Sequence, residues 1–157
     1  MVSQIRKETA SRTTPWTMEE LKKLIPQPLT NKSKWKIKTS HNGGKARNLA
    51  DGKMEPRWDS ATSMKSGMWV TVELPSSTNI NSVRLDCSGS NGDYPRGYKL
   101  FISQDGKSWK EVAKGNGKSP VVDINFSAVK AKHIKVELTK GNRLYWSIHE
   151  MDIFQKF

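Results

Sequence analysis

The sequence has very few of the residues that build disulfide-bonded or metal-stabilised folds. It contains one cysteine, Cys87, and three histidines among 157 residues. One cysteine excludes an internal disulfide and any cysteine-rich zinc site. Apolar runs are only a few residues long, so no transmembrane segment is predicted. What the sequence does have is tryptophan: six of them argue against intrinsic disorder and for one folded domain of ordinary size.

Signatures of catalysis are also missing. No Gly-x-Ser-x-Gly motif is present, and residues 42–45 resemble half of a phosphate loop but lack its leading glycine. His133 and His149 lie in predicted strands, where packing is the simpler explanation for a histidine. The acidic residues are scattered, so spacing alone assigns no carboxylate pair for glycoside hydrolysis. We therefore expect that the chain is not an enzyme.

Acidic residues are far fewer than basic ones. The chain has 27 Lys and Arg against 15 Asp and Glu, which gives a formal net charge of +12. Half of the excess lies in residues 1–40, which carry nine basic and three acidic residues. Such a charge favours an anionic partner, which could be an acidic polysaccharide, a nucleic acid or an anionic membrane. Solubility explains the charge equally well.

The chain divides near residue 32. Residues 1–32 form a predicted N-terminal extension with one short helix, which opens at a capping box made by Thr17 and Glu20. Pro26 ends this helix because a proline ring does not fit its interior. Between the capping box and Pro26, apolar residues recur at helical spacing, namely Met18, Leu21, Leu24 and Ile25.

Residues 33–157 have the pattern of an all-β domain. Apolar residues alternate with polar ones, and Asp105-Gly106 is typical of a tight hairpin. The pattern predicts an antiparallel jelly-roll β-sandwich of about eight strands. The predicted strands are 35–39, 68–74, 80–86, 97–103, 108–113, 121–126, 133–138 and 147–154. Their inward faces are predicted to carry Val70, Val72, Leu85, Leu100, Ile102, Ile124, Ile134, Val136 and Ile148.

Ligand recognition is the chemistry that the sequence supports best. Aromatic and polar residues are mixed in the irregular stretches 40–67 and 87–96 and near residue 145. An aromatic ring covers the C–H face of a sugar, and Arg, Asp and Asn bind its hydroxyls. The predicted site consists of His41, Trp58, Asn91, Asp93, Arg96, Arg143, Tyr145 and Trp146.

Several of these residues have a structural alternative. Trp58 and Trp146 stand at loop borders, where a core position is equally plausible. Asp93 is close enough to Arg96 in sequence to pair with it, which would make both of them loop supports. Three other tryptophans, Trp35, Trp69 and Trp109, lie inside predicted strands and are assigned to the core.

A cation site is predicted at Asp51 and Glu150. Asp51-Gly52 lies in the first long loop, where an Asp carboxylate and backbone carbonyls can bind calcium. An ordinary Asp-Gly turn is the alternative. Glu150 stands among apolar residues, so its carboxylate needs a cation, an arginine or a hydrogen-bond donor.

The order of several short motifs resembles the discoidin, or coagulation factor C-type, domain of the galactose-binding-like superfamily. No single motif is diagnostic, but the series covers about residues 33–157. Residues 93–98 (DYPRGY) and 146–150 (WSIHE) are most similar to the bacterial members. The other motifs are 48–52 (NLADG), 57–60 (RWDS), 69–74 (WVTVEL), 80–85 (INSVRL), 102–109 (ISQDGKSW) and 131–136 (AKHIKV).

The resemblance implies a jelly-roll sandwich that binds ligands on loops at one end. The bacterial members are commonly non-catalytic carbohydrate-binding modules, monomeric and attached to larger proteins that are extracellular, periplasmic or at the cell surface. Family members often hold a structural calcium, whose ligands map onto Asp51 and Glu150. The family usually has Thr where this chain has Pro56, so one hydroxyl ligand is absent.

The sequence therefore predicts a module that attaches a parent protein to a glycan or polysaccharide, and the charge favours an acidic one. The alternative is an adhesion module for protein or for an anionic membrane surface. Its loops offer only a weak membrane-insertion set, namely Met54, Met64, Met68 and Leu144. No nucleic-acid partner is expected, because no recognised motif accompanies the charge.

Overall fold

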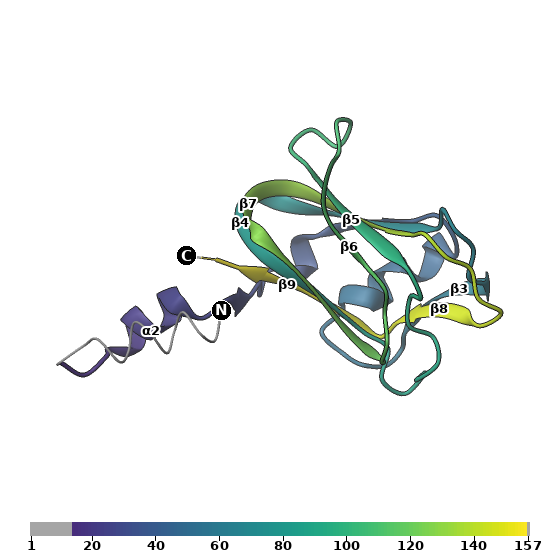
Figure 1. The fold of residues 1–157 in the computed structure, drawn as a ribbon, viewed down its shortest axis with the longest axis horizontal. Helices are drawn as coiled ribbons and strands as arrows, with labels where there is room; N and C mark the ends of the chain where they lie inside the picture. The colour runs from purple at the N-terminus through teal and green to yellow at the C-terminus, as the bar shows by residue number, and fades with distance from the viewer. Residues whose placement is uncertain (1–13, 157) are drawn as a thin grey trace.

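The computed structural model describes residues 14–156, and these form an all-β sandwich with a short helix beside it (Figure 1). Its main sheet has the strand order β1-β9-β4-β7-β5-β6, with β2 paired to β4, and every pairing is antiparallel. The predicted fold class is confirmed. The strands are β1 (Gln27–Pro28), β2 (Lys36–Thr39), β4 (Trp69–Asp86), β5 (Tyr98–Ser103), β6 (Lys110–Gly115), β7 (Val121–Leu138) and β9 (Glu150–Gln155).

The sandwich arises because β4 and β7 are long and bent. Each has 18 residues, where the sequence predicted two short strands. Their register shifts between Glu73 and Thr78, and such irregularities bend a strand. The first half of β4 lies in one layer with β2, β5 and the second half of β7. Its second half lies in the other layer with β9 and the first half of β7.

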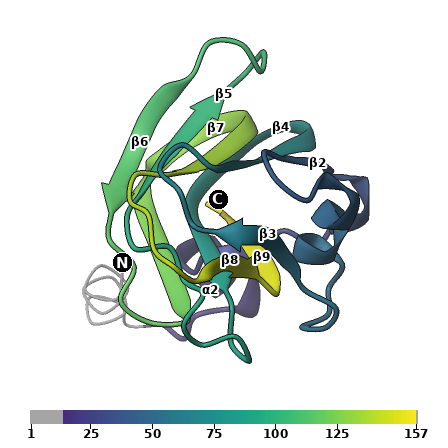
Figure 2. The same cartoon turned by 90° about the vertical axis from the view of Figure 1, so that its right-hand side faces the viewer.

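A second, two-stranded sheet closes one end of the sandwich. It pairs β3 (Trp58–Ser63) with β8 (Tyr145–Ile148), and Figure 2 views the molecule from this end. The sequence missed β3 because it lies inside a stretch predicted to be a loop. The predicted strand 147–154 is instead divided between β8 and β9. Two 3₁₀ helices, η1 (Lys32–Lys34) and η2 (Gly43–Ala50), flank β2.

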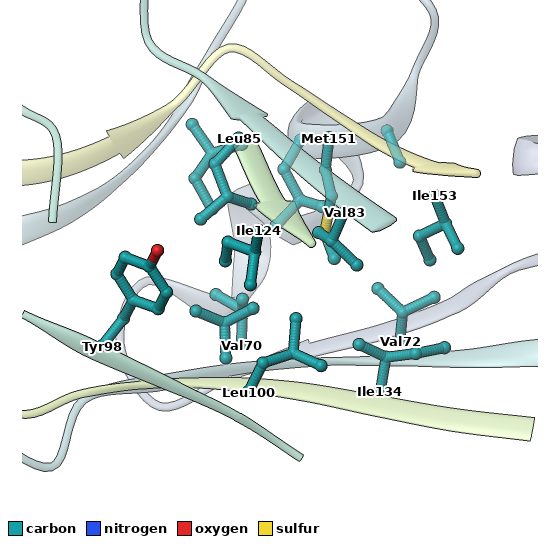
Figure 3. Close-up of a cluster of buried hydrophobic side chains, with 14 of the residues drawn as sticks. Val70, Val72, Val83, Leu85, Tyr98, Leu100, Ile124, Ile134, Met151 and Ile153 are labelled. Atoms are coloured by element: carbon teal, nitrogen blue, oxygen red, sulfur yellow. The ribbon is translucent and has the colours of Figure 1, made fainter. Parts of the chain in front are cut away.

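The core lies between the two layers. In Figure 3, Val70, Val72 and Ile134 of one layer face Val83 and Met151 of the other. Every residue predicted to face inward is buried. Among the three tryptophans that the sequence assigned to the core, only Trp35 is buried. Trp69 and Trp109 are partly exposed, so that assignment was wrong for both.

The predicted N-terminal helix is present as α2 (Met18–Leu24), with both hydrogen bonds of the Thr17 capping box. Figure 1 shows it outside the sandwich. Residues 27–32, however, contact the domain. β1 pairs with β9, and Leu29 is buried in the core, with its backbone N–H 2.8 Å from the Ile153 carbonyl. No helix within residues 14–156 is long and apolar enough to cross a membrane.

Candidate functional site

Three loops meet at the end of the sandwich that carries β3 and β8 (Figure 2). We call residues 40–60 the first site loop, 87–96 the second and 142–146 the third. The first and second are joined by Arg57, whose Nη1 donates a hydrogen bond to Ser90 Oγ over 2.7 Å. The structure thus brings together segments that the sequence predicted to form one surface.

The second and third site loops are also in direct contact. Ser147, directly after the third loop, binds Asp93 of the second: its Oγ donates to Asp93 Oδ2 over 2.6 Å, and its N–H donates to the Asp93 carbonyl over 3.1 Å. A Cβ atom at Gly92 would lie 2.8 Å from Leu144 Cδ1, so glycine permits this close approach. These contacts fix the position of the third loop against the second.

A buried histidine, His149, contacts both the first and the second site loop. His149 is 1% exposed, and its Nε2 lies 2.9 Å from Ser90 Oγ. Its Nδ1 lies 2.7 Å from the Met54 carbonyl. Serine beside histidine is the geometry of a nucleophile with its base. Here the ring is covered and Arg57 also binds the same hydroxyl, so we interpret the network as a structural brace.

Trp58 and Trp146 do not belong to the binding surface. Their exposed fractions are 1% and 0%, and their rings pack edge to face with centroids 5.3 Å apart. A ring without exposed surface cannot stack on a sugar, so their assignment to the site was wrong and the core alternative is confirmed. The Trp58 Nε1–H donates to the His41 carbonyl over 3.2 Å. His41 itself is partly exposed, with Nδ1 2.9 Å from Ser40 Oγ.

Asp93 and Arg96 support the second site loop, but they do so separately. The guanidinium of Arg96 lies 3.7 Å from the Tyr94 ring centroid, and its Nη1 donates to the carbonyls of Gly92 and Tyr94 over 2.9 and 2.6 Å. Asp93 is instead held by Ser147. Arg96 Nη1 and Asp93 Oδ2 are therefore both engaged within the protein.

Of the predicted site residues, Tyr145, Arg143 and Asn91 have the most exposed side chains. Tyr145 is 43% exposed at the start of β8, and Arg143 is exposed. The Arg143 backbone is held by Ser63, whose Oγ donates to its carbonyl over 2.8 Å, while its guanidinium has no partner within residues 14–156. Asn91 accepts a hydrogen bond from Gly89 N and keeps its amide N–H₂ available. A ring, a guanidinium and an amide together can bind a sugar.

Glu150, a predicted calcium ligand, is already paired with a cation. Its carboxylate binds the Lys32 ammonium, which also lies 2.7 Å from Asp152 Oδ1. The Gly52 N–H donates to both Glu150 oxygens over 3.2 Å. Burial raises the pKa of Glu150, and Lys32 only partly offsets this. Burial also lowers the pKa of Lys32, but hydrogen bonds from its ammonium to Asp152 and Glu150 outweigh burial and raise it.

This arrangement does not fit a calcium ion between Asp51 and Glu150. Calcium takes six to eight oxygen ligands, whereas an ammonium and a backbone N–H point at Glu150. Asp51 Oδ1 accepts the Lys53 N–H over 2.9 Å, as in an ordinary turn. No three acidic, His or Cys side chains within residues 14–156 converge as metal ligands would. The sequence predicted that Glu150 needs a cation, an arginine or a hydrogen-bond donor, and in the structure Lys32 and the Gly52 N–H are its partners.

Comparison with known proteins shows which folds and which family this chain is similar to. No curated protein matches the chain in sequence. Similar solved structures include CpGH89CBM32-5 from Clostridium perfringens, in complex with GalNAc-β-1,3-galactose; it is 24% identical, with a TM-score of 0.71, over 82% of this chain and 99% of that one. Another is chitosan-binding module 2 of a Paenibacillus sp. IK-5 chitosanase/glucanase, in complex with chitotriose; it is 27% identical, with a TM-score of 0.66, over 77% and 96%.

A third similar structure is the family 32 CBM of C. perfringens NanJ, in complex with galactose. It has the same fold at 18% identity, with a TM-score of 0.72, over 83% of this chain and all of that one. The family match itself covers residues 30–151, from the segment after β1 to the second residue of β9. The chain therefore belongs to the F5/8 type C domain family.

Proposed function

We propose that this chain is a non-catalytic carbohydrate-binding module that attaches a larger protein to a glycan. The observation that carries the proposal is that Tyr145 is 43% exposed and stands two residues from Arg143, whose side chain is exposed and has no partner within residues 14–156. The Paenibacillus chitosan-binding modules, up to 27% identical, support a sugar as the ligand.

Binding at this surface uses one ring and two polar groups. Tyr145 stacks on the C–H face of a sugar, while Arg143 and Asn91 donate hydrogen bonds to its hydroxyls. The site loops are held in place by the Arg57–Ser90 and Ser147–Asp93 hydrogen bonds, so they lose little conformational freedom on binding. A single ring on an open surface gives weak affinity, on the order of micromolar to millimolar.

The module works outside the cytoplasm as part of a longer polypeptide. Among similar structures, the truncated AlyQ contains a CBM32 and alginate lyase domains, and this chain covers 34% of it. Such an arrangement keeps an enzyme close to a polymeric substrate, because a second tethered contact raises the effective concentration of the first.

The adhesion alternative loses part of its support in this structure. Of the four apolar loop residues that could enter a membrane, Met64 and Met68 are each 2% exposed. Only Met54 and Leu144 remain at the surface. Two isolated apolar side chains do not make an insertion patch.

The test compares Tyr145→Ala and Arg143→Ala with Arg84→Ala, an exposed arginine of β4 that is paired with Asp123 on the neighbouring strand β7. Binding to chitotriose and to GalNAc-β-1,3-galactose is measured by calorimetry, and each variant is first checked for an unchanged melt. We expect the two site variants to lose at least about tenfold in affinity, or about 1.4 kcal/mol, and the control to lose none. Full binding by both site variants would show that the sugar site lies elsewhere.

A further inference from the structure

A hollow of about 560 Å³ lies on the outer face of the layer that contains β2, β4 and β7. This volume is in the range of small-ligand sites, about 300–1,000 Å³. We call it the sheet groove. It shares no lining residue with the three exposed side chains of the loop site. Its lining includes four lysines and three aromatic side chains, namely Lys36, Lys38, Lys107, Lys135, Trp69, Trp109 and His133.

Strand alternation places the lysines on this face. Val70 and Val72 point into the core, so Thr71 between them points outward. Lys38 of β2 and Lys135 of β7 are both in register with Thr71. Lys38 and Lys135 therefore lie on opposite sides of Thr71, which belongs to the floor of the groove.

The hairpin between β5 and β6 forms a fixed wall for the groove; in Figures 1 and 2 it projects beyond the rest of the sheet. Asp105 Oδ1 accepts the N–H groups of Lys107 and Ser108 over 2.8 and 2.9 Å, and these bonds lower the pKa of Asp105 to about 2. Gly106 has a φ of +76°, and a Cβ there would lie 3.1 Å from His133 Cε1. The hairpin is thus closely packed against His133 of β7.

The positive charge of the groove is not neutralised from within. The groove is lined by two acidic residues, Glu73 and Asp105. The Glu73 carboxylate lies 3.7 Å from Lys36 Nζ and 3.9 Å from His133 Nδ1. The other, Asp105, binds its own turn. Within residues 14–156, Lys38, Lys107 and Lys135 have no carboxylate partner.

The aromatic rings of the groove lie next to this charge. The Lys135 ammonium is 4.8 Å from the Trp109 ring centroid, which is cation–π distance. Trp69 and Trp109 are partly exposed, although the sequence had assigned both to the core. Part of each ring is therefore available to a ligand.

We propose that the sheet groove is a second binding site and that its ligand is a segment of an acidic polysaccharide carrying carboxylate or sulfate groups. The unpaired lysines bind the acidic groups, and a partly exposed tryptophan contacts a pyranose face. This site rests on the proposed function and extends it, because it adds a contact for acidic groups that is separate from the loop site.

The experiment measures retardation of the chain in native gels containing polygalacturonate or heparin. Lys38→Gln/Lys135→Gln is compared with Lys114→Gln/Lys130→Gln, which removes the same charge from exposed lysines of β6 and β7 outside the groove. We expect the groove variant to lose about tenfold or more in affinity for at least one of these polymers, and the control to lose less than about twofold. Trp109→Ala should lose affinity as well, and Lys38→Arg/Lys135→Arg should retain it.

Three results would overturn the proposal. These are no retardation of the unchanged chain by either polymer, equal losses in the groove and control variants, or tighter binding to duplex DNA than to both polymers with the same dependence on Lys38 and Lys135. Binding of GalNAc-β-1,3-galactose should be unchanged in the groove variants. A failure of the loop site would appear in the Tyr145 variant instead, so the two proposals can fail separately.

Discussion

Replacing Lys32 by Met should destabilise the domain strongly, although Lys32 precedes the predicted domain boundary. The Lys32 side chain is 16% exposed, and its partners Glu150 and Asp152 are 10% and 29% exposed. Removing one partner of a buried ion pair costs about 3–5 kcal/mol, because the other charge is left buried and unpaired. Since Asp152 is partly solvated, we expect a smaller loss of about 2–4 kcal/mol.

The measurement is thermal unfolding at pH 7. For a domain of this size, 1 kcal/mol shifts the Tm by about 2–4 °C, so the Tm should fall by roughly 4–16 °C. The pKa of Lys32 is raised from 10.5 in the folded state, so its contribution is fully present below that pH and is lost as the pH rises through the folded pKa. Lys36→Met is the control, because its pair with Glu73 is exposed and surface pairs contribute about 0–1 kcal/mol.

Adding Glu150→Gln to the Lys32→Met variant should restore part of the loss, since the unpaired charge is then removed. A metal chelator should leave the Tm of the unchanged chain where it was, because Lys32 supplies the positive charge at Glu150. The reasoning would be refuted by a Lys32→Met variant as stable as Lys36→Met. A lower Tm on chelation would show that calcium binds here after all.

Two further predictions concern the domain boundary and the buried tryptophans. A chain of residues 27–157 should melt like the full chain, whereas residues 33–157 should be several kcal/mol less stable, because they lack Lys32 and the buried Leu29, which alone contributes about 1.5–3 kcal/mol. If residues 33–157 melted at the same temperature as residues 27–157, the predicted boundary at residue 33 would be supported instead. Trp146→Ala should cost about 3–5 kcal/mol of stability as a core truncation; an unchanged melt with lost glycan binding would return Trp146 to the site.

Some features of this protein were predictable because they depend on neighbouring residues. The capping box at Thr17 and the Asp105-Gly106 turn each need only a few adjacent residues, and both are present. Val70 and Val72 were predicted to be buried because a strand alternates its faces. The same alternation already placed Trp69 on the opposite face, so its assignment to the core overlooked a signal that was there.

The sequence by itself determined the all-β class and the inward faces of the strands, since these follow from local periodicity and turn chemistry. The expectation that the loops meet at one end came from the resemblance to the discoidin domain. Only the tertiary structure decided which side chains are free. Trp58 and Trp146 are covered because two short strands close the end of the sandwich, and Lys32 reaches Glu150 across 118 positions of sequence. Burial and ion pairing depend on which segments meet in space, and local patterns do not specify that.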